Sequence, residues 1–224
     1  MTVVDGTVDR SGRELEMTKV GAILLAAGAS RRFGAGSKLV ADFHGEPLMR
    51  RAARTLGESR LAEIVVVTGH EAQLCRDALQ GLQVIWAHND GWERGMGSSI
   101  ATGVAALDPG LDGTFIVPGD MPFLGAKLLQ KLTDAFSASG ARPIVFPATQ
   151  QGEQRNPVLW PRRFFAELAT LTGHEGAKAI LQQHASEAVS VRIDDEQEFL
   201  DVDTASDLDA ARESFARNRN SAKE

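Results

Sequence analysis

The chain has 224 residues, a mass of 24.0 kDa, and 24 Lys plus Arg against 30 Asp plus Glu, which gives a formal net charge of −6. This length suits one large α/β domain, and the acidic balance argues against general binding to nucleic acid or to an anionic membrane. Cys75 is the only cysteine, which excludes a disulfide framework and a thiolate metal cluster. No long apolar segment or signal-peptide pattern occurs, so we expect a cytoplasmic protein.

Polar segments at both ends flank the expected domain. Residues 1–18 contain glycine and have no hydrophobic period, and residues 217–224 are also polar. The sequence therefore predicts a single domain over residues 19–216, with flexible tails on either side.

An apolar run followed by a glycine-rich, cationic loop is the most informative stretch of the chain. Residues 20–27 predict a buried strand, and the glycines and cations after it are Gly28, Arg32, Gly34, Gly36 and Lys38. In open α/β sheets, the loops at the carboxyl ends of strands bind ligands. Glycines let backbone N–H groups approach a ligand, and Arg and Lys bind phosphate oxygens. The whole stretch therefore predicts a polyphosphate site, whereas any one of its residues alone could belong to an ordinary solvated loop.

Two well-known phosphate loops do not fit this stretch. A P-loop needs Gly-Lys-Ser/Thr, but Lys38 lies between Ser37 and Leu39. The G-x-G-x-x-G pattern of dinucleotide-binding proteins does not occur here either. Because the protein is acidic, a triphosphate site in it implies a divalent cation as well as local Arg and Lys.

Helices and strands alternate over the next part of the chain. The expected elements are helix, strand, helix and strand over residues 47–56, 64–67, 71–80 and 82–87. This alternation predicts right-handed crossovers and a mainly parallel sheet covered on both faces. Thr68 and Gly69 end the second strand at the ligand-binding edge. His70 and His88 have no partner at metal-ligand spacing, so we expect ordinary surface histidines.

A second loop of small residues leads into a helix. Gly91, Gly95 and Gly97 precede Ser98 and Ser99, where the expected helix begins. Such a loop offers free N–H groups and hydroxyls to a flat polar base or to an anion. Helix capping explains one serine but not the three glycines.

Carboxylates follow two further segments near the expected ligand edge. Asp120 comes directly after the strand expected over residues 114–117 and could hold Mg²⁺, although Pro-Gly-Asp is equally good turn chemistry. Asp201 and Asp203 precede Thr204 and Asp207, which predict a capping box for the last helix. These two aspartates could therefore be metal ligands or acids at a helix start.

Together these motifs resemble the nucleotidyltransferases of the molybdenum-cofactor type. The quoted matches are L-A-A-G-x-S-x-R-x-G…K over 25–38, G-M-G-S-S over 95–99, G-D-M-P over 119–122 and D-V-D-T over 201–204. The guanylyltransferase branch usually has glycine where this chain has Ala27, so the closest resemblance is to the cytidylyltransferase branch that acts on molybdopterin. The resemblance covers residues 20–215.

This resemblance implies a fold, a reaction and a set of site residues. The fold is a three-layer α/β/α, Rossmann-like architecture of the nucleotide-diphospho-sugar transferase type, with a mainly parallel mixed sheet. The reaction is transfer of CMP from CTP to the terminal phosphate of a molybdopterin cofactor, with release of pyrophosphate. The resemblance implies that Lys38, Arg32 and Asp120 are catalytic. It also implies that Asp120 and Asp203 bind Mg²⁺ and that Asp201 has a supporting role. The implied nucleotide contacts are Leu25, Ala26, Ala27, Gly28, Ser30, Gly34, Thr68, Gly69, Gly97, Ser98 and Asn156.

The expected acceptor half departs from the family pattern. Arg155 stands where glycine is usual, His174 replaces an aspartate, and Lys178 replaces an arginine while keeping the charge. Another phosphorylated acceptor such as a sugar phosphate therefore remains an alternative, as does a chaperone that binds nucleotide or cofactor without turnover. The oligomeric state is open, as is delivery to a molybdoenzyme or its chaperone. No nucleic-acid or membrane partner is expected.

Overall fold

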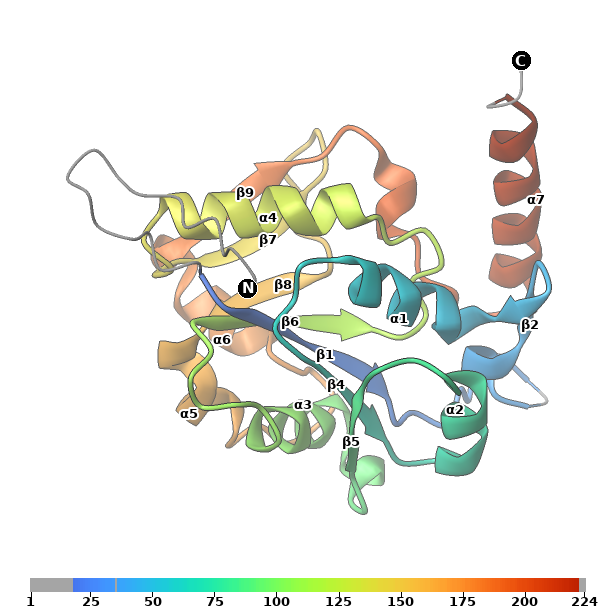
Figure 1. Ribbon diagram of the computed structural model, residues 1–224, viewed down its shortest axis with the longest axis horizontal. Coiled ribbons are helices and arrows are strands. Elements are labelled where there is room, and N and C mark those ends of the chain that lie inside the picture. Colours follow the sequence, from blue (N-terminus) through green and yellow to red (C-terminus); the bar gives the residue numbers. More distant parts are fainter. Residues whose placement is uncertain (1–17, 35, 222–224) are drawn as a thin grey trace, which may run out of the picture.

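A seven-stranded sheet forms the centre of the computed structural model, which describes residues 18–34 and 36–221 (Figure 1). The strand order is β5-β4-β1-β6-β8-β7-β9. The strands are β1 Val20–Ala26, β4 Ile64–Thr68, β5 Ile85–His88, β6 Gly113–Pro118, β7 Ile144–Ala148, β8 Val158–Pro161 and β9 Ala188–Arg192. Only β8 runs antiparallel to its neighbours β6 and β7 among the described strands of this sheet.

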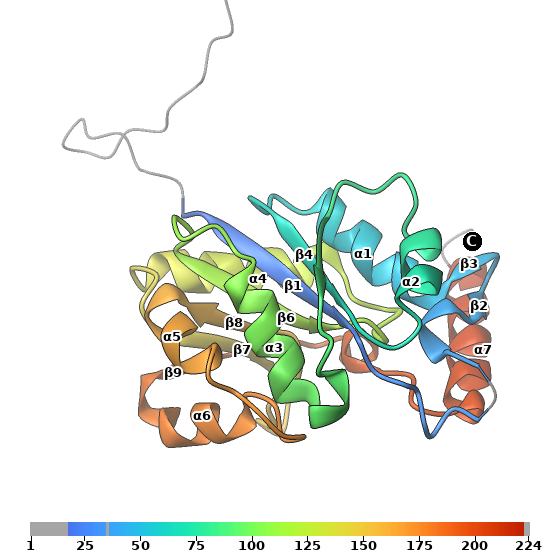
Figure 2. The ribbon, with the colours of Figure 1, turned by 90° about the horizontal axis from the view of Figure 1, so that it is seen from below.

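Helices cover both faces of the sheet (Figures 1 and 2). The helices on these faces are α1 Leu48–Glu58, α2 Ala72–Ala78, α3 Met96–Ala105, α4 Ala126–Ala138, α5 Phe165–Leu168 and α6 Lys178–Gln183, and the last helix is α7 Ala205–Ser221. Short 3₁₀ helices include η1 Lys38–Val40, η2 Trp92–Arg94, η3 Arg162–Phe164, η4 Ala185–Glu187 and η5 Glu196–Phe199. The expected three-layer α/β/α architecture with a mainly parallel mixed sheet is confirmed.

The alternation of side chains along β1 explains how the two helical layers are held. Ala22 and Leu24 belong to the buried cluster that includes residues of α1, α2 and α4. Ile23 belongs to the cluster on the other face, with residues of α3, α5 and α6. Successive side chains of a strand point to opposite faces, so an apolar run buries both. The run at 64–67 is buried for the same reason.

Helix α7 packs at the side of the molecule rather than on a sheet face (Figure 1). It shares a small apolar cluster with the hairpin of β2 Asp42–Phe43 and β3 Glu46–Pro47, which contributes Phe43 beside Leu208 and Ala211 of the helix. The capping box expected at its start is confirmed, because Thr204 N–H donates to Asp207 Oδ2 at 2.7 Å and Asp207 N–H donates to Thr204 Oγ1 at 3.2 Å. This packing positions Asp203, which immediately precedes the helix.

Several element ends differ from expectation. Helix α3 begins at Met96, before the two serines, and α7 extends to Ser221, past the domain end that we expected at residue 216. The tail expected over residues 1–18 lies outside the described residues except for Thr18. None of the described helices combines the length and the apolar character needed to cross a bilayer.

Candidate active site

The loop after β1 folds back on itself and returns the chain to the sheet edge. Ser30 adopts a positive φ of 52°, and its hydroxyl accepts a hydrogen bond from the Lys38 N–H at 3.2 Å. Gly34 and Gly36 have φ values of 95° and 88°, which glycine adopts without strain. A Cβ at Gly28 would meet no protein atom within 4 Å. The space beside Gly28 is therefore open to a ligand.

Asp120 and Asp203 reach this loop from two other segments. Gly119 donates its N–H to the Leu25 carbonyl at 3.0 Å, and a Cβ on it would lie 2.8 Å from that oxygen, so glycine allows β6 and β1 to approach closely before Asp120. Val202 N–H donates to the Asp120 carbonyl at 3.0 Å, which fixes the segment carrying Asp203 against the same strand end.

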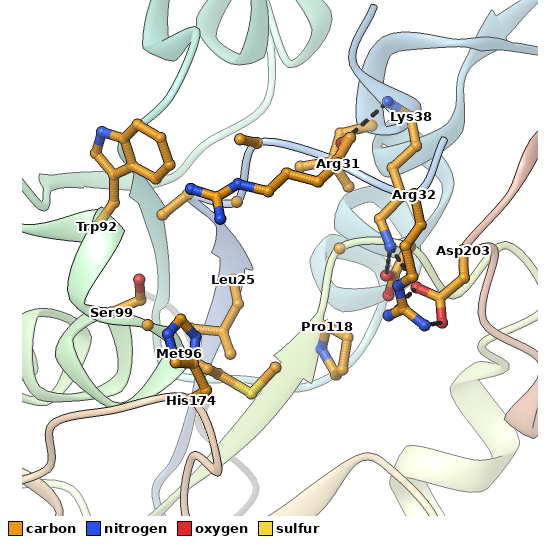
Figure 3. A pocket seen from close by; sticks show the side chains of 18 of the residues that line it. Leu25, Arg31, Arg32, Lys38, Trp92, Met96, Ser99, Pro118, His174 and Asp203 are labelled. Atoms are coloured by element: carbon orange, nitrogen blue, oxygen red, sulfur yellow. Dashed lines mark hydrogen bonds and ion pairs between the residues drawn. The ribbon is translucent and has the colours of Figure 1, made fainter. Parts of the chain in front are cut away.

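Lys38 joins the two aspartates. Its Nζ lies 2.5 Å from Asp120 Oδ2 and 3.0 Å from Asp203 Oδ1. Arg32 makes a bidentate ion pair with Asp203, in which its two terminal nitrogens Nη2 and Nη1 lie 2.9 Å from Oδ1 and Oδ2 (Figure 3). The structure thus brings together Lys38, Arg32, Asp120 and Asp203, the four residues that the sequence analysis assigned to catalysis and metal binding.

Burial and the neighbouring charges have opposite effects on the pKa of Lys38. Burial alone would lower the pKa of Lys38, but the pull of Asp120 and Asp203 outweighs it, so that the pKa of the ammonium is raised. Burial and then the negative charge of Asp120 raise the pKa of Asp201. The carboxylates therefore favour a cation at the position that the Lys38 ammonium holds.

One carboxylate oxygen of the cluster lacks a partner. Asp120 Oδ1 is buried without a hydrogen bond. A hard divalent cation takes such oxygens as ligands, so Asp120 and Asp203 fit a metal chemically. Among the described residues, no group of three or more His, Cys, Asp or Glu is arranged to hold a metal ion. A metal here would need further oxygens from a ligand or water.

A cavity of about 360 Å³ opens beside this cluster. One end carries Arg32, Lys38, Asp120 and Asp203, and the other carries Trp92, Met96, Ser99 and His174, with the Arg31 side chain extending from the loop toward Trp92 (Figure 3). Leu25 of β1 and Ala27, Gly28 and Ser30 of the loop after it also line the cavity. The cavity therefore has a cluster of ion-paired side chains at one end and the large side chains of Trp92 and Met96 at the other.

Several predicted nucleotide contacts do not line this cavity. Ala26 and Thr68 are 1% and 0% exposed within the sheet. Gly34 lies in the loop and is not one of the residues that line the cavity. Gly69 instead packs against Trp92, since a Cβ at Gly69 would lie only 2.6 Å from Trp92 Cβ. Asn156 lines a second cavity of about 660 Å³, together with Arg155, Lys178 and Asp201.

Gly97 and Ser98 also lie behind the cavity wall. Ser98 Oγ donates to the carbonyl of Gly95 at 2.8 Å and accepts from Asn89 Nδ2 at 2.9 Å, so its hydroxyl holds the preceding loop. Gly97 lets the chain at Thr172 approach, since a Cβ would lie 2.7 Å from the Thr172 carbonyl oxygen. The neighbouring Ser99, in the first turn of α3, lines the cavity instead.

The cavity also contains residues that the sequence analysis did not assign to the nucleotide. Arg31 extends into it and has no hydrogen-bond or ion-pair partner within the described part of the chain (Figure 3). Its place beside Arg32 in the cationic loop was a usable signal. His174, expected on the acceptor side, lines this cavity because Gly97 N–H donates to the Gly173 carbonyl at 2.9 Å.

The chain belongs to the family of MobA-like NTP transferase domains, whose family model matches residues 22–189. This confirms the expected molybdopterin nucleotidyltransferase family and makes the protein a nucleotidyltransferase by class. It is 28% identical to a probable molybdenum cofactor guanylyltransferase of Natronomonas pharaonis, over 85% of this chain and 96% of that protein. It is 27% identical to a nicotine blue oxidoreductase of Paenarthrobacter nicotinovorans, over 87% of this chain and 97% of that protein.

Solved structures show the same fold. Rv0371c from Mycobacterium tuberculosis superposes with a TM-score of 0.76 at 22% identity, covering 88% of this chain and 99% of that chain. A second structure of Rv0371c is a complex with manganese and superposes with a TM-score of 0.71, covering 88% of this chain and 100% of that chain. A nucleotidyl transferase from Methanothermobacter has a TM-score of 0.76 at 20% identity, covering 89% of this chain and 99% of that chain. The expected nucleotide-diphospho-sugar transferase type of fold is confirmed.

Proposed function

We propose that the protein transfers CMP from CTP to the terminal phosphate of a molybdopterin cofactor and releases pyrophosphate. The observation that carries the proposal is the arrangement of the cavity, which has Arg32 and Lys38 at one end and the large side chains of Trp92 and Met96 at the other. A nucleoside triphosphate has a matching arrangement of phosphates and base. The cavity volume of about 360 Å³ lies within the usual range of small-molecule sites.

The reaction requires no covalent intermediate with the protein and no general base. An acceptor phosphate is already an ionised nucleophile, so its oxygen attacks the α-phosphorus without a general base. A new P–O bond forms, the bond between the α-phosphorus and the bridging oxygen breaks, and pyrophosphate leaves with that electron pair. The protein contributes positioning and charge neutralisation, for which Arg31, Arg32 and Lys38 are suitably placed.

Mg²⁺ is the expected metal, with Asp120 and Asp203 as its protein ligands. The unpartnered Asp120 Oδ1 supports this assignment. When bound, the metal would neutralise phosphate charge. Lys38 now contacts both carboxylates, so binding of a cation requires the ammonium to move, and a triphosphate would provide it with new partners. The manganese complex of Rv0371c is consistent with a divalent ion in this fold.

CTP is proposed as the nucleotide because of Ala27. This residue lines the cavity and is only 4% exposed, and its Cβ would lie 3.0 Å from a Cβ at Gly69. Its methyl group reduces the room left for a base, which disfavours the larger guanine. One methyl group is typically worth only about 1–3 kcal/mol, so other positions must contribute to selectivity.

The second cavity is the proposed place of the acceptor. Arg155 and Lys178 supply positive charge there, and Asp201 adjoins the charged cluster through the segment that leads to Asp203. Arg155 is paired with Glu153 at 2.5 Å, so an acceptor anion would compete for its guanidinium. Glu196 and Asp201 also line this cavity, so the proposal of a phosphorylated acceptor rests on Arg155 and Lys178 and not on a net positive charge.

The direct test measures pyrophosphate released from CTP or GTP with Mg²⁺, using molybdopterin and a sugar phosphate as alternative acceptors. We expect release with CTP and molybdopterin, and a large loss in Asp120→Asn. Ala27→Gly should narrow the CTP preference in kcat/KM without reversing it. A wild-type preference for GTP would overturn the base assignment and leave nucleotidyl transfer standing. No release with any acceptor would refute the proposed reaction.

A further inference from the structure

Large side chains with apolar surface are left open at one end of the cavity. Met96 and Trp92 both line the cavity wall. Met96 is 49% exposed, and Trp92 is only partly buried. Figure 3 shows these two side chains and His174 on the side of the cavity away from Lys38 and Asp203. Exposed apolar surface within a concave site is typical of a ligand contact.

The position of Trp92 is set by its own loop and by β4. Trp92 N–H donates to the Asn89 carbonyl at 3.2 Å, and the Trp92 carbonyl accepts from Gly95 N–H at 3.1 Å. A Cβ at Gly69 would lie 2.8 Å from Trp92 Cγ, so the side chain packs directly on that backbone. The indole is also 5.0 Å from the His70 ring, centroid to centroid. The ring is thus supported from behind by the segment after β4.

Met96 and His174 are joined through backbone contacts. Gly97, next to Met96, donates its N–H to the Gly173 carbonyl at 2.9 Å. A Cβ at Gly176 would lie 3.0 Å from Met96 Sδ. The loop carrying His174 is therefore held against the first turn of α3.

We propose that Trp92 and Met96 form the surface on which the nucleotide base rests, with His174 closing that end of the cavity. The inference rests on the proposed function, since it assumes that a nucleotide binds here. Every base has a flat π face, and aromatic rings and thioethers both pack well on such faces. Stacking discriminates poorly between bases, so this surface strengthens binding of CTP and GTP alike and leaves selectivity to residues such as Ala27.

The test compares ligands that have and lack a base. Calorimetry would give Kd for CTP, GTP and inorganic tripolyphosphate, each with Mg²⁺. Trp92→Ala should raise Kd for both nucleotides about tenfold, or about 1.4 kcal/mol, and leave Kd for tripolyphosphate unchanged. Met96→Ala should produce the same pattern with a smaller change.

Fluorescence provides a second readout and a matched control. Trp86 lies on β5 outside the cavity, with the Arg76 guanidinium 4.8 Å from its ring centroid. CTP should change the emission of wild type and Trp86→Phe but not that of Trp92→Phe. Because Trp92→Phe keeps an aromatic ring, it also guards against a folding defect in Trp92→Ala.

The outcomes separate this inference from the proposed reaction. Equal weakening of tripolyphosphate and CTP by Trp92→Ala would overturn the inference, as would a fluorescence response that survives in Trp92→Phe. Wild type that binds CTP no more tightly than tripolyphosphate would also overturn it, leaving the phosphate site intact. The expected binding pattern without any pyrophosphate release would support the base surface and refute the reaction.

Discussion

Replacing Lys38 with methionine tests the charged cluster most directly. The substitution keeps a long side chain but removes the ammonium that contacts Asp120 at 2.5 Å and Asp203 at 3.0 Å. Two carboxylates then face each other without their shared cation, and only Arg32 still neutralises Asp203. The protein should remain folded, become less stable, and bind a triphosphate more weakly.

The size of the effect follows from burial. The side chains of Lys38 and Asp120 are 15% and 14% exposed, and that of Asp203 is 28% exposed. Removing one partner of a buried ion pair costs about 3–5 kcal/mol, and we expect about 3 kcal/mol because Arg32 remains. In a protein of this size that corresponds to a fall in Tm of about 6–12 °C. Loss of a charge-assisted contact to the triphosphate should cost about 1.5–3 kcal/mol of binding free energy.

The assay follows Tm with and without Mg²⁺ or Mn²⁺. Without Lys38, Asp120 has lost its ion-pair partner and Asp203 keeps only Arg32, so the metal should raise the Tm of Lys38→Met more than that of wild type. Lys178→Met is the matched control, because Lys178 is exposed at the second cavity and should leave both Tm and the metal response unchanged. A Tm of Lys38→Met equal to that of wild type would refute this account of the cluster. A metal-induced rise in Tm no larger than that of wild type would refute it as well.

Three further predictions concern other parts of the chain. Burial and then the charge of Asp195 raise the pKa of Glu198, so its stabilising contribution exists at acid pH and is lost as pH rises through the folded-state pKa. Glu198→Gln should therefore have a higher Tm than wild type at neutral pH, and this difference in Tm should disappear at acid pH. The same difference in Tm at neutral and at acid pH would contradict the prediction. Burial, with the charge of Glu71, raises the pKa of Cys75 to about 11, so iodoacetamide should label this 1%-exposed thiol only after denaturation. Thr204→Ala should cost about 1 kcal/mol by removing the capping box of α7, and Thr204→Ser should restore most of that stability.

Local patterns in the sequence were sufficient to predict several elements and part of the site. The apolar run before Gly28, the β-branched run at 64–67 and the Thr204–Asp207 capping box all appear where the sequence predicted them. These signals are local, because alternation and capping involve residues only a few positions apart. Lys38 and Asp120 were also predicted, since both follow strands whose carboxyl ends meet at one edge.

Tertiary structure alone decided which of two neighbouring residues lines the cavity. Asn89 Nδ2 donates to the hydroxyls of both Ser98 and Ser99, but the Ser98 hydroxyl also donates to the Gly95 carbonyl at 2.8 Å, and of the two serines Ser99 lines the cavity. Likewise, Arg32 is paired with Asp203, which lies 171 positions away in the chain, whereas Arg31 extends into the cavity. A periodicity or a motif does not specify these choices.

The same reason applies to the separation of the two cavities. Lys178 and His174 lie close together in the sequence, yet His174 lines the first cavity and Lys178 the second. That division depends on the backbone contact between Gly173 and the start of α3, and on β8 being inserted antiparallel between β6 and β7. The residue types in the chain determined the chemistry available to the protein, but packing between distant segments determined which side chains can reach one ligand.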